Sequence, residues 1–437
     1  MIPLNMVNEQ KPRQIAARVL GQRRTNGLFV EDLLEIALTR AALSSADRGL
    51  CQEIVYGVVR WQATLDWLIA LKTGGREQKP ALQTLLRLGL YQIFWLDRIP
   101  DHAAVHETVE LAKQGGFGPQ AGFVNALLRG YLREAVETRK RLTDLRVSQP
   151  ALGWSQPEWL VTRWQKRWGA EKTARLLEWN NTPPKTFARV NTLKTDAGQL
   201  VEQWRKENVE YDFKTCDWTG ENLVFELKSH PPLGSLASFR SGAFYIQDPS
   251  TLLAVRELNP QPGETVLDLC AAPGGKTTFL AQLLGNQGRI VAQDVSEDRL
   301  KLIQENCDRL GVACVELVLP SILHSQPAAH FDRILVDAPC SNSGVMRRRL
   351  DLRWRIQLEE IGRLRATQLD LLHQAAARLK PGGTLVYSTC SLEPEENEEV
   401  VQQFLREQTG FRLERQRELL PFADSVDGAY VARLVKS

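Results

Sequence analysis

One stretch decides the fold of this chain: residues 265–277, Thr-Val-Leu-Asp-Leu-Cys-Ala-Ala-Pro-Gly-Gly-Lys-Thr. Its apolar first part is typical of a buried strand, and the apolar residues after Thr277 recur at helical spacing. The paired glycines let the backbone come close to a ligand, and the free N–H groups at a helix start favour negative charge. The pattern therefore predicts a strand, a glycine turn and a helix, with a ligand held where the turn meets the helix.

The length and composition indicate a globular protein with two or three domains. A chain of 437 residues exceeds what one hydrophobic core supports, and 43% hydrophobic with 24% charged residues are globular values. The chain has no apolar run long enough for a membrane span. No apolar segment of the kind found in a secretory signal follows the basic residues near the N-terminus. The seven cysteines include no Cys-x-x-Cys pair, which argues against a disulfide framework and a zinc ribbon. We therefore expect a cytoplasmic protein without membrane association and without metal.

The first third of the chain is predicted to be helical. Apolar residues recur at helical spacing from residue 11 to about 140, as from Leu33 to Leu38, without a convincing strand pattern. The net charge of the chain is only +3, but the first 150 residues carry 20 basic against 15 acidic side chains. This all-α domain, assigned to residues 1–148, is therefore the better candidate for docking a polyanion, with ordinary solvated helix faces as the alternative.

Residues 149–241 are predicted to form a small α+β module, which begins near Pro150 and Pro157. Its predicted helices are 158–168, 170–179 and 196–207, and its predicted strands are 186–190, 211–213 and 223–227. Arg189 and Lys194 could contact phosphate groups, although single basic residues in such a module usually lie on the surface.

From residue 242 to the C-terminus, strand and helix patterns alternate. The predicted strands are 243–246, 265–269, 289–293, 315–319, 333–336, 384–387 and 429–435. The predicted helices include 250–258, 299–310, 356–379 and 395–406. Alternation of this kind implies a parallel, doubly wound sheet whose ligands bind outside the carboxyl ends of its strands.

The glycine turn could hold a nucleoside triphosphate, a dinucleotide or S-adenosylmethionine. A P-loop needs a glycine five residues before its last glycine, and Cys270 stands at that position. The dinucleotide motif Gly-x-Gly-x-x-Gly is absent. Asp294 lies 19 residues after Gly275, a spacing known for acids that pair with ribose hydroxyls. S-adenosylmethionine is therefore favoured, and a P-loop NTPase that uses Lys276 is the rival reading.

Two further predicted strands are followed by cysteines. The motif Asp-Ala-Pro-Cys (337–340) and the pair Thr-Cys (389–390) each place a thiol where cofactor and substrate should meet. A single cysteine there is usually a small buried hydrophobic residue, but two flanking one cleft suggest chemistry. A methyltransferase needs a thiolate when its acceptor is carbon 5 of a pyrimidine, because that carbon becomes nucleophilic only after a thiolate adds to carbon 6.

Several motifs together resemble those of the RNA cytosine-carbon-5 methyltransferases. They are Cys-Ala-Ala-Pro-Gly-Gly-Lys at 270–276, Asp-Ala-Pro-Cys-Ser at 337–341, Ser-Thr-Cys-Ser at 388–391 with Pro-Glu-Glu-Asn at 394–397, Arg-Val-Asn at 189–191, Tyr-Ile-Gln-Asp-Pro-Ser at 245–250, and Arg-Arg at 347–348 with Asp351 and Trp354. The helical first third, with Asp47-Arg48 and residues 53–60, is similar to the NusB-type RNA-binding domain. This combination points to the bacterial subfamily that methylates small-subunit ribosomal RNA.

The resemblance implies a multidomain α and α/β fold. A NusB-like domain and the α+β module would precede a Rossmann-like methyltransferase domain at 242–437, with a mostly parallel seven-stranded sheet. The implied reaction is S-adenosylmethionine-dependent methylation of carbon 5 of a cytosine in small-subunit ribosomal RNA, through a covalent cysteine–cytosine intermediate. The implied partner is that RNA, and we separately expect a monomer. The main alternative is a non-catalytic RNA-binding or ribosome assembly factor, against which the retained cysteines, acids and glycine turn argue.

The resemblance also implies roles for single residues. Cys390 would be the nucleophile, Cys340 would assist product release, and Asp337 would lie beside the cofactor and the target base. The residues alone leave the two cysteine roles open, because the Pro-Cys cysteine attacks in DNA cytosine methyltransferases. The residues implied to line the cofactor are Cys270, Ala271, Ala272, Pro273, Gly274, Gly275, Lys276, Asp294 and Asp337. The acidic run 395–399 is interpreted as a helix start that suits the helix dipole.

The chain departs from the family pattern at two places. Leu319-Pro320 replaces the usual Gly-Asp, whose acid meets adenine, so backbone groups or neighbours such as Ser321 would hold the adenine. Arg349-Leu350 stands where the family usually has a pair that contains proline. This difference would alter a loop near the RNA and add a phosphate contact. Both departures bear on affinity, since neither touches the proposed chemistry.

Overall fold

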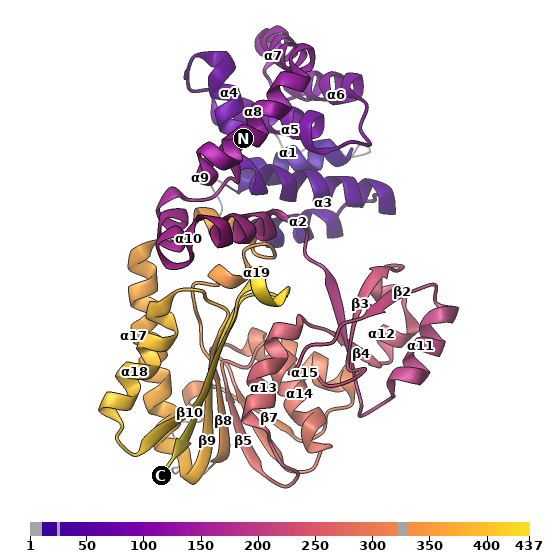
Figure 1. The fold of residues 1–437 in the computed structure, drawn as a ribbon. Coiled ribbons are helices and arrows are strands. Elements are labelled where there is room, and N and C mark those ends of the chain that lie inside the picture. The colour runs from indigo at the N-terminus through magenta and orange to yellow at the C-terminus, as the bar shows by residue number, and fades with distance from the viewer. Residues whose placement is uncertain (1–10, 24–26, 322–330) are drawn as a thin grey trace. The chain divides into compact units, whose positions relative to one another are not determined.

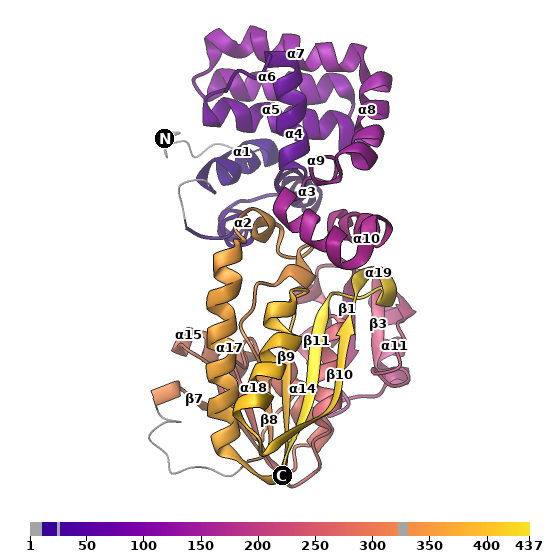
Figure 2. The same cartoon turned by 60° about the vertical axis from the view of Figure 1, so that its left-hand side comes forward.

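The computed structural model describes residues 11–23, 27–321 and 331–437, and the chain divides into two compact units (Figure 1; Figure 2). The first unit runs to Thr182 and also includes Met346–Arg355; the second comprises Pro183–Val345 and Ile356–Ser437. This division differs from the boundaries expected after residues 148 and 241. The module at 149–241 is split, because its first helices join the first unit and its strands join the second.

Helices build the first unit, as the apolar spacing predicted. They are α1 (Pro12–Gln22), α2 (Val30–Thr39), α3 (Ser45–Arg60), α4 (Gln62–Thr73), α5 (Pro80–Trp95), α6 (Asp101–Gln114), α7 (Ala121–Arg133), α8 (Ala135–Ser148), α9 (Pro150–Gly153) and α10 (Glu158–Asn181), with the short 3₁₀ helices η1 (Gly118–Gln120) and η5 (Leu350–Trp354). The apolar faces of α1 to α8 share one core with η5, in which Ile54, Leu86 and Leu128 are fully buried. Gly169, with φ of 79°, breaks α10 between the two predicted helices.

The segment Met346–Arg355 packs as part of this helical core. The guanidinium of the buried Arg353 donates to the carbonyl of Arg60 at 3.0 Å and to Asn181 Oδ1 at 2.9 Å. Trp354 donates from its indole nitrogen to a carbonyl of α3 at 2.9 Å. Ten residues that lie within the C-terminal half of the sequence therefore belong structurally to the N-terminal helices.

Leu350, one residue of the pair that departs from the family pattern, packs in the helical core. Its side chain is buried among the helices and its N–H donates to Glu31 Oε1 at 3.0 Å. A leucine suits that position because apolar burial there adds to the core. Arg349, the other residue of the departing pair, is exposed. That this pair alters a loop near the RNA stays a prediction.

Gly57 of α3 provides a test of how closely α3 packs on α5. A Cβ at Gly57 would lie 1.8 Å from Cζ of the buried Tyr91. Glycine to alanine in a helix usually stabilises by about 1 kcal/mol. We expect Gly57→Ala instead to lower the free energy of unfolding by about 1–3 kcal/mol, because the Tyr91 ring must move and its hydrogen bond to Glu53 is disturbed. Thermal denaturation followed by circular dichroism measures the change.

Gly49→Ala is the matched control in the same helix. Nothing lies within 4 Å of a Cβ at Gly49, so alanine there should stabilise by the usual amount. Stabilisation by both substitutions would contradict the close approach of Gly57 and Tyr91.

A four-stranded antiparallel sheet opens the second unit. Its strands, in the order β2–β3–β1–β4, are β1 (Thr186–Val190), β2 (Glu210–Phe213), β3 (Val224–Ser229) and β4 (Phe244–Ile246), accompanied by α11 (Ala197–Lys206) and α12 (Ala237–Arg240). Asp196 starts α11 by accepting a hydrogen bond from the N–H of Gln199 at 2.9 Å. Trp204 of α11 packs edge to face on Phe225 and Phe244, which joins the helix to the sheet.

The strand at 243–246 has a different place from the one expected. It was assigned to the catalytic domain, but β4 pairs with β1, with Ala188 opposite Ile246, and so completes the small sheet. An apolar alternation locates a strand without naming its partner, which is why the sequence could not place β4.

The second sheet has seven strands in the order β10–β11–β9–β8–β5–β6–β7. They are β5 (Thr265–Leu269), β6 (Arg289–Gln293), β7 (Val315–Val318), β8 (Phe331–Asp337), β9 (Leu379–Thr389), β10 (Phe411–Leu419) and β11 (Ala429–Lys436). The helices are α13 (Leu252–Leu258), α14 (Gly275–Leu284), α15 (Glu297–Leu310), α17 (Leu358–Arg378), α18 (Glu398–Glu407) and α19 (Pro421–Asp424), with the 3₁₀ helices η2 (Leu233–Ser235), η3 (Pro249–Thr251), η4 (Ser343–Val345) and η6 (Pro394–Glu396). Strands β5 to β9 pair in parallel and β10 and β11 antiparallel, which confirms a mostly parallel, Rossmann-like sheet.

Helices cover both faces of this sheet (Figure 2). On β5, Val266 packs into the cluster formed with α13 and α14, whereas Leu267 and Leu269 pack into the cluster formed with α17 and α18. A strand buried on both faces carries apolar residues in succession, and this is the run from which the fold was predicted.

The edge strand β10 is absent from the predicted strands. Between its buried ends, Phe411 and Leu419, lie mostly charged and exposed residues, so it lacks the apolar alternation of a half-buried strand. Charged side chains on an edge strand hinder pairing with a second sheet, which explains the composition.

Candidate active site

The glycine turn lies between β5 and α14, as predicted. Cys270 leaves the strand with φ of 63°, and Gly274 enters the helix with φ of 96°. A Cβ at Gly274 would lie 3.2 Å from Ile303 Cγ2 of α15, so glycine allows both the left-handed backbone and the close packing. The turn thereby points the first N–H groups of α14 to the carboxyl edge of the sheet.

Arg189 supports this turn from the small sheet. It is buried, donates to the carbonyl of Gly275 at 2.9 Å and to Thr278 Oγ1 at 3.1 Å, and also donates to Gln247. Burial lowers the pKa of Arg189 to about 9. Both interpretations of Arg189 from the sequence, a phosphate contact and a surface position, are therefore wrong, because its guanidinium is buried and donates to groups inside the protein.

Lys194 is likewise committed to the fold. Its ammonium donates to the carbonyl of Ser241 at 2.8 Å and to that of Arg309, in the last turn of α15, at 2.7 Å. A cation at a helix C-terminus is favourable, so Lys194 joins the small sheet to α15. Its side chain is exposed, as single basic residues in such a module usually are.

Asp294, which directly follows β6, contacts the glycine turn. Its carboxylate accepts from the N–H of Ala272 and of Val295, both at 2.8 Å, and pairs with Arg299 Nε at 2.5 Å. The predicted ribose partner thus lies beside the predicted cofactor loop. Its carboxylate is almost fully buried, whereas the Arg299 side chain is half exposed.

Three carboxylates surround the start of the turn. Burial, followed by the charges of Asp337, Asp294 and Asp268, raises the pKa of the Cys270 thiol to about 12. Asp294 and Asp337 are each paired with a cation, Arg299 and Lys276, so neither cation is left unpaired to meet a triphosphate. Lys276, which a P-loop would direct to phosphates, is instead paired with Asp337 Oδ2 at 2.6 Å. The electrostatics of the turn therefore argue against a triphosphate.

Asp268 is the most deeply buried of these acids. It accepts from Thr277 Oγ1 at 2.6 Å, and Oδ1 has no hydrogen-bond partner among the described residues. Burial raises its pKa to about 7. Between pH 4 and 7 the folded protein therefore holds a proton that the unfolded chain has released, so this group makes stability fall as the pH rises.

Asp268→Asn should remove this pH dependence. Between about pH 4.5 and 6.5, Asp268 should lower the free energy of unfolding of the unsubstituted protein by about 1.4 kcal/mol for each unit that the pH rises. The variant should lack this fall, because asparagine does not ionise. Urea denaturation at several pH values measures the difference. Asp298→Asn, on the exposed start of α15, is the control and should show no such slope, since Lys301 lowers the pKa of Asp298. A pH-independent effect of Asp268→Asn would contradict the raised pKa.

The two cysteines meet at the same edge of the sheet. Cys340 follows β8 and Cys390 follows β9, and the two sulfur atoms are 3.4 Å apart. Parallel neighbouring strands end at one edge, which explains why residues 50 positions apart come together. Cys340 is buried, and its contact with the Cys390 thiol, together with burial, raises its pKa well above the usual value. The half-buried Cys390 contacts Asn342 Oδ1 at 3.0 Å.

Asp337 and Lys276 connect the glycine turn to the cysteines. Asp337 lies at the end of β8, where it accepts from Ser388 Oγ of β9 at 2.9 Å as well as from Lys276. Burial opposes the charge of Lys276, but the Asp337 carboxylate and the Cys390 sulfur outweigh it and raise the pKa of Lys276. The cation of Lys276, the last residue of the predicted cofactor loop, therefore lies near the predicted nucleophile.

Sequence reasoning missed Asn342 and Glu396. Asn342 has φ of 57° and contacts the Cys390 sulfur, yet its only signal in the sequence is its position two residues after Cys340. Glu396 was interpreted with its acidic neighbours as a helix start. That interpretation holds for Glu398 and Glu399, in the first turn of α18, but Glu396 is fully buried among polar groups near the cysteines.

The structure describes little of the expected adenine site. Leu319 and Pro320 follow β7, and Ser321 is exposed, while residues 322–330 lie outside the described part of the chain. The proposal that backbone groups or Ser321 hold the adenine therefore stays a prediction.

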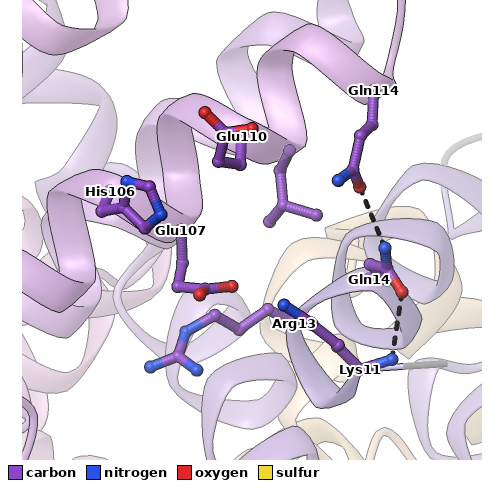
Figure 3. Close-up of a pocket in the computed structure, with 8 residues that line it drawn as sticks. Lys11, Arg13, Gln14, His106, Glu107, Glu110 and Gln114 are labelled. Carbon is purple, nitrogen blue, oxygen red and sulfur yellow. Dashed lines mark hydrogen bonds between the residues drawn. The ribbon is translucent and has the colours of Figure 1, made fainter. Parts of the chain in front are cut away.

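A pocket of about 400 Å³ lies in the first unit between α1 and α6 (Figure 3). Its polar side chains contact one another: Gln14 donates to Gln114 at 2.9 Å and accepts from the N–H of Lys11 at 3.0 Å. Arg13 and Glu107 give it charges of both signs, and neither cysteine of the pair lines it. Nothing in this pocket matches the predicted chemistry.

The described residues form neither a metal site nor a membrane-spanning helix. Within 11–23, 27–321 and 331–437, no group of three or more histidine, cysteine or acidic side chains is placed to hold a metal ion. In the same part of the chain, no helix is both long and apolar enough to span a membrane.

The fold and the turn together define a class of protein. A Rossmann-like seven-stranded sheet, a glycine turn after β5 and an acid after β6 form an S-adenosylmethionine-dependent methyltransferase. The 16S rRNA methyltransferase RsmB/F model matches residues 255–435, the NusB family model matches 10–133, and an RsmF/B-like ferredoxin-like domain model matches 156–226. The chain belongs to the RsmB/F family of methyltransferases.

Individual relatives extend over most of the chain. The probable ribosomal RNA small subunit methyltransferase B of Bacillus subtilis is 38% identical over 91% of this chain and 89% of its own length. The protein of the same description from Synechocystis is 37% identical over 92% of this chain and 90% of its own. A crystal structure of a methyltransferase homologue from Pyrococcus horikoshii covers 66% of this chain and 97% of its own, with 34% identity and a TM-score of 0.58.

Proposed function

We propose that this protein methylates carbon 5 of a cytosine in small-subunit ribosomal RNA through a covalent cysteine–cytosine intermediate. The observation that carries the proposal is the 3.4 Å contact between the thiols of Cys340 and Cys390, at the strand ends beside the Lys276–Asp337 pair. A single thiol is enough to add to a base. A second thiol in contact with the first is suited to help the first thiol leave the base afterwards. Methyl transfer to a nitrogen or to a ribose oxygen would need neither.

The proposed chemistry gives the two thiols different roles. Bound S-adenosylmethionine would supply an electrophilic methyl group, held by residues 270–276 and Asp294. The Cys390 thiolate would add to carbon 6, and the electron pair of the carbon 5–carbon 6 double bond would move to carbon 5, which then accepts the methyl group. Lys276, which lies near this sulfur, would interact with the attacking thiolate.

Product release reverses the addition. Carbon 5 would lose its proton, the electron pair of that C–H bond would restore the double bond, and the C–S electron pair would return to Cys390. Cys340 suits a supporting role because its raised pKa keeps it a neutral thiol that can donate a hydrogen bond to the departing sulfur. Asp337 would hold Lys276 beside the reacting atoms.

Ribosomal RNA as the substrate is supported by the names of the relatives and by the NusB match of the helical domain. A cytosine in a duplex hides carbon 5 and carbon 6 within the stack, so the target must be single-stranded or flipped out. The helical domain and the small sheet would hold the RNA around it.

The test is incubation with small-subunit ribosomal RNA and S-adenosylmethionine labelled in its methyl group. We expect the label in 5-methylcytidine after digestion of the RNA to nucleosides. Label in a different nucleoside would contradict the carbon-5 assignment. Cofactor binding without transfer to RNA would favour the non-catalytic assembly factor.

A further inference from the structure

The carboxylate of Glu396 lies between the two loops that carry the cysteines. It is fully buried; Oε1 accepts from the N–H of Ser341 at 2.8 Å, and Oε2 accepts from Ser391 Oγ at 2.5 Å and from Ser341 Oγ. Ser341 directly follows Cys340, and Ser391 directly follows Cys390. One side chain therefore contacts both loops at the residue next to each thiol.

Neighbouring groups hold Glu396 itself in place. Gln368 of α17 donates to Oε1 at 3.1 Å, and the hydroxyl of Tyr387 donates to the backbone carbonyl of Glu396 at 2.5 Å. The next residue, Asn397, donates to the carbonyl of Ser391 at 2.9 Å. A buried carboxylate is stable only when hydrogen-bond donors surround it, and here both loops supply them, so neither loop can move alone without exposing the buried acid.

We infer that Glu396 is a positioning residue that sets the distance between the two thiols and thereby couples thiol addition to thiol release. This inference rests on the proposed function for its role in catalysis, but the geometric part can be tested without RNA. Glu396 makes no hydrogen bond to either sulfur, so its effect on the distance between the thiols would pass through Ser341 and Ser391, while its charge also raises the pKa of Cys340.

The geometric test is oxidation of the RNA-free, full-length protein with diamide. Diamide takes up two electrons and two protons from the thiols of Cys340 and Cys390, which become a disulfide, and is itself reduced to the hydrazine. Peptide mapping by mass spectrometry gives the rate of this one cross-link. We expect Glu396→Ala to slow it about tenfold or more, because a misplacement of about 1 Å between reacting groups has effects of that size or larger. Glu396→Gln should stay near the original rate, since glutamine retains one acceptor and the serine hydroxyls can rotate to accept from its amide.

Glu399→Ala is the matched control from the same acidic run. Glu399 is partly exposed and pairs with Arg365, so its loss should leave the cross-linking rate unchanged. If Glu396→Ala does not fold, the double variant Ser341→Ala with Ser391→Ala removes the two hydroxyl donors and should slow the cross-link in the same way. An unchanged rate in a folded variant of either kind would overturn the inference.

A second readout separates this inference from the proposed reaction. If cytosine methylation occurs, Glu396→Ala should lower kcat with little change in KM for S-adenosylmethionine, and Glu396→Gln should recover most of the activity. Slow cross-linking by Glu396→Ala in a protein that never methylates RNA would sustain the positioning role and overturn the proposed function. Normal cross-linking with normal kcat in Glu396→Ala would overturn the positioning role and sustain the proposed function.

Discussion

Replacing Cys390 with alanine is expected to abolish methyl transfer to RNA. Without a thiolate to add to carbon 6, carbon 5 of cytosine does not become nucleophilic, so the rate should fall by about three orders of magnitude or more, the scale seen when a nucleophile is removed from a catalytic unit. Transfer of label from S-adenosylmethionine into 5-methylcytidine measures the loss. Binding of S-adenosylmethionine should persist, because the glycine turn and Asp294 are untouched.

Cys314→Ala is the control for this substitution. Cys314 is also a half-buried free cysteine of the second unit, but it precedes β7 and lies outside the cysteine pair. Its variant should methylate RNA at close to the original rate. Undiminished transfer by Cys390→Ala would remove Cys390 from the chemistry.

Replacing Cys340 with alanine is expected to trap the enzyme on its RNA. Addition of Cys390 to the base and methyl transfer should still occur, but the thiol that contacts the departing sulfur at 3.4 Å would be gone. The covalent RNA–protein adduct should therefore accumulate, with a large part of the enzyme in a band of reduced mobility on a denaturing gel. Nuclease treatment should return that band to the position of the free protein.

The double variant identifies which sulfur is attached. Cys340→Ala combined with Cys390→Ala should give no adduct, because the attacking thiol is then missing. If Cys390→Ala alone is the variant that traps RNA, the two roles are reversed and Cys340 is the nucleophile. The raised pKa of Cys340 makes that outcome the less expected one, since a thiol with a raised pKa is a poorer source of thiolate.

Electrostatics in the tertiary structure weaken the P-loop alternative more than the sequence could. The sequence argument rested on Cys270 at the position of a required glycine. The structure adds that Lys276 is paired with Asp337 and that three carboxylates act on Cys270. The charge of a lysine that is paired with an acid attracts a phosphate chain only weakly. The same Gly-Lys-Thr that suggested a triphosphate therefore serves a different site.

Most of the fold was predictable because its signals are local. Strands β1, β5 and β6 match their predicted ranges residue for residue, since their apolar content differs from that of the flanking turns. The site was predictable in outline for a related reason. In a parallel sheet the residues after each strand gather at one edge, so Cys340, Cys390 and Asp337 were expected together before their distances were known.

The sequence by itself thus determined the helical first third, the alternating strands and helices and the glycine turn, because each depends on neighbours within a few residues. It also placed the two thiols together, because parallel strands end at one edge of their sheet. Only the tertiary structure decided that β4 joins the small sheet, that Arg189 braces the turn and that Glu396 links the cysteine loops. Their partners are distant in sequence: Arg189 contacts a residue 86 positions away, and Glu396 contacts Ser341 across 55. No local pattern encodes such contacts, because they arise only when the packed chain removes a polar group from water and another segment must supply its hydrogen bonds.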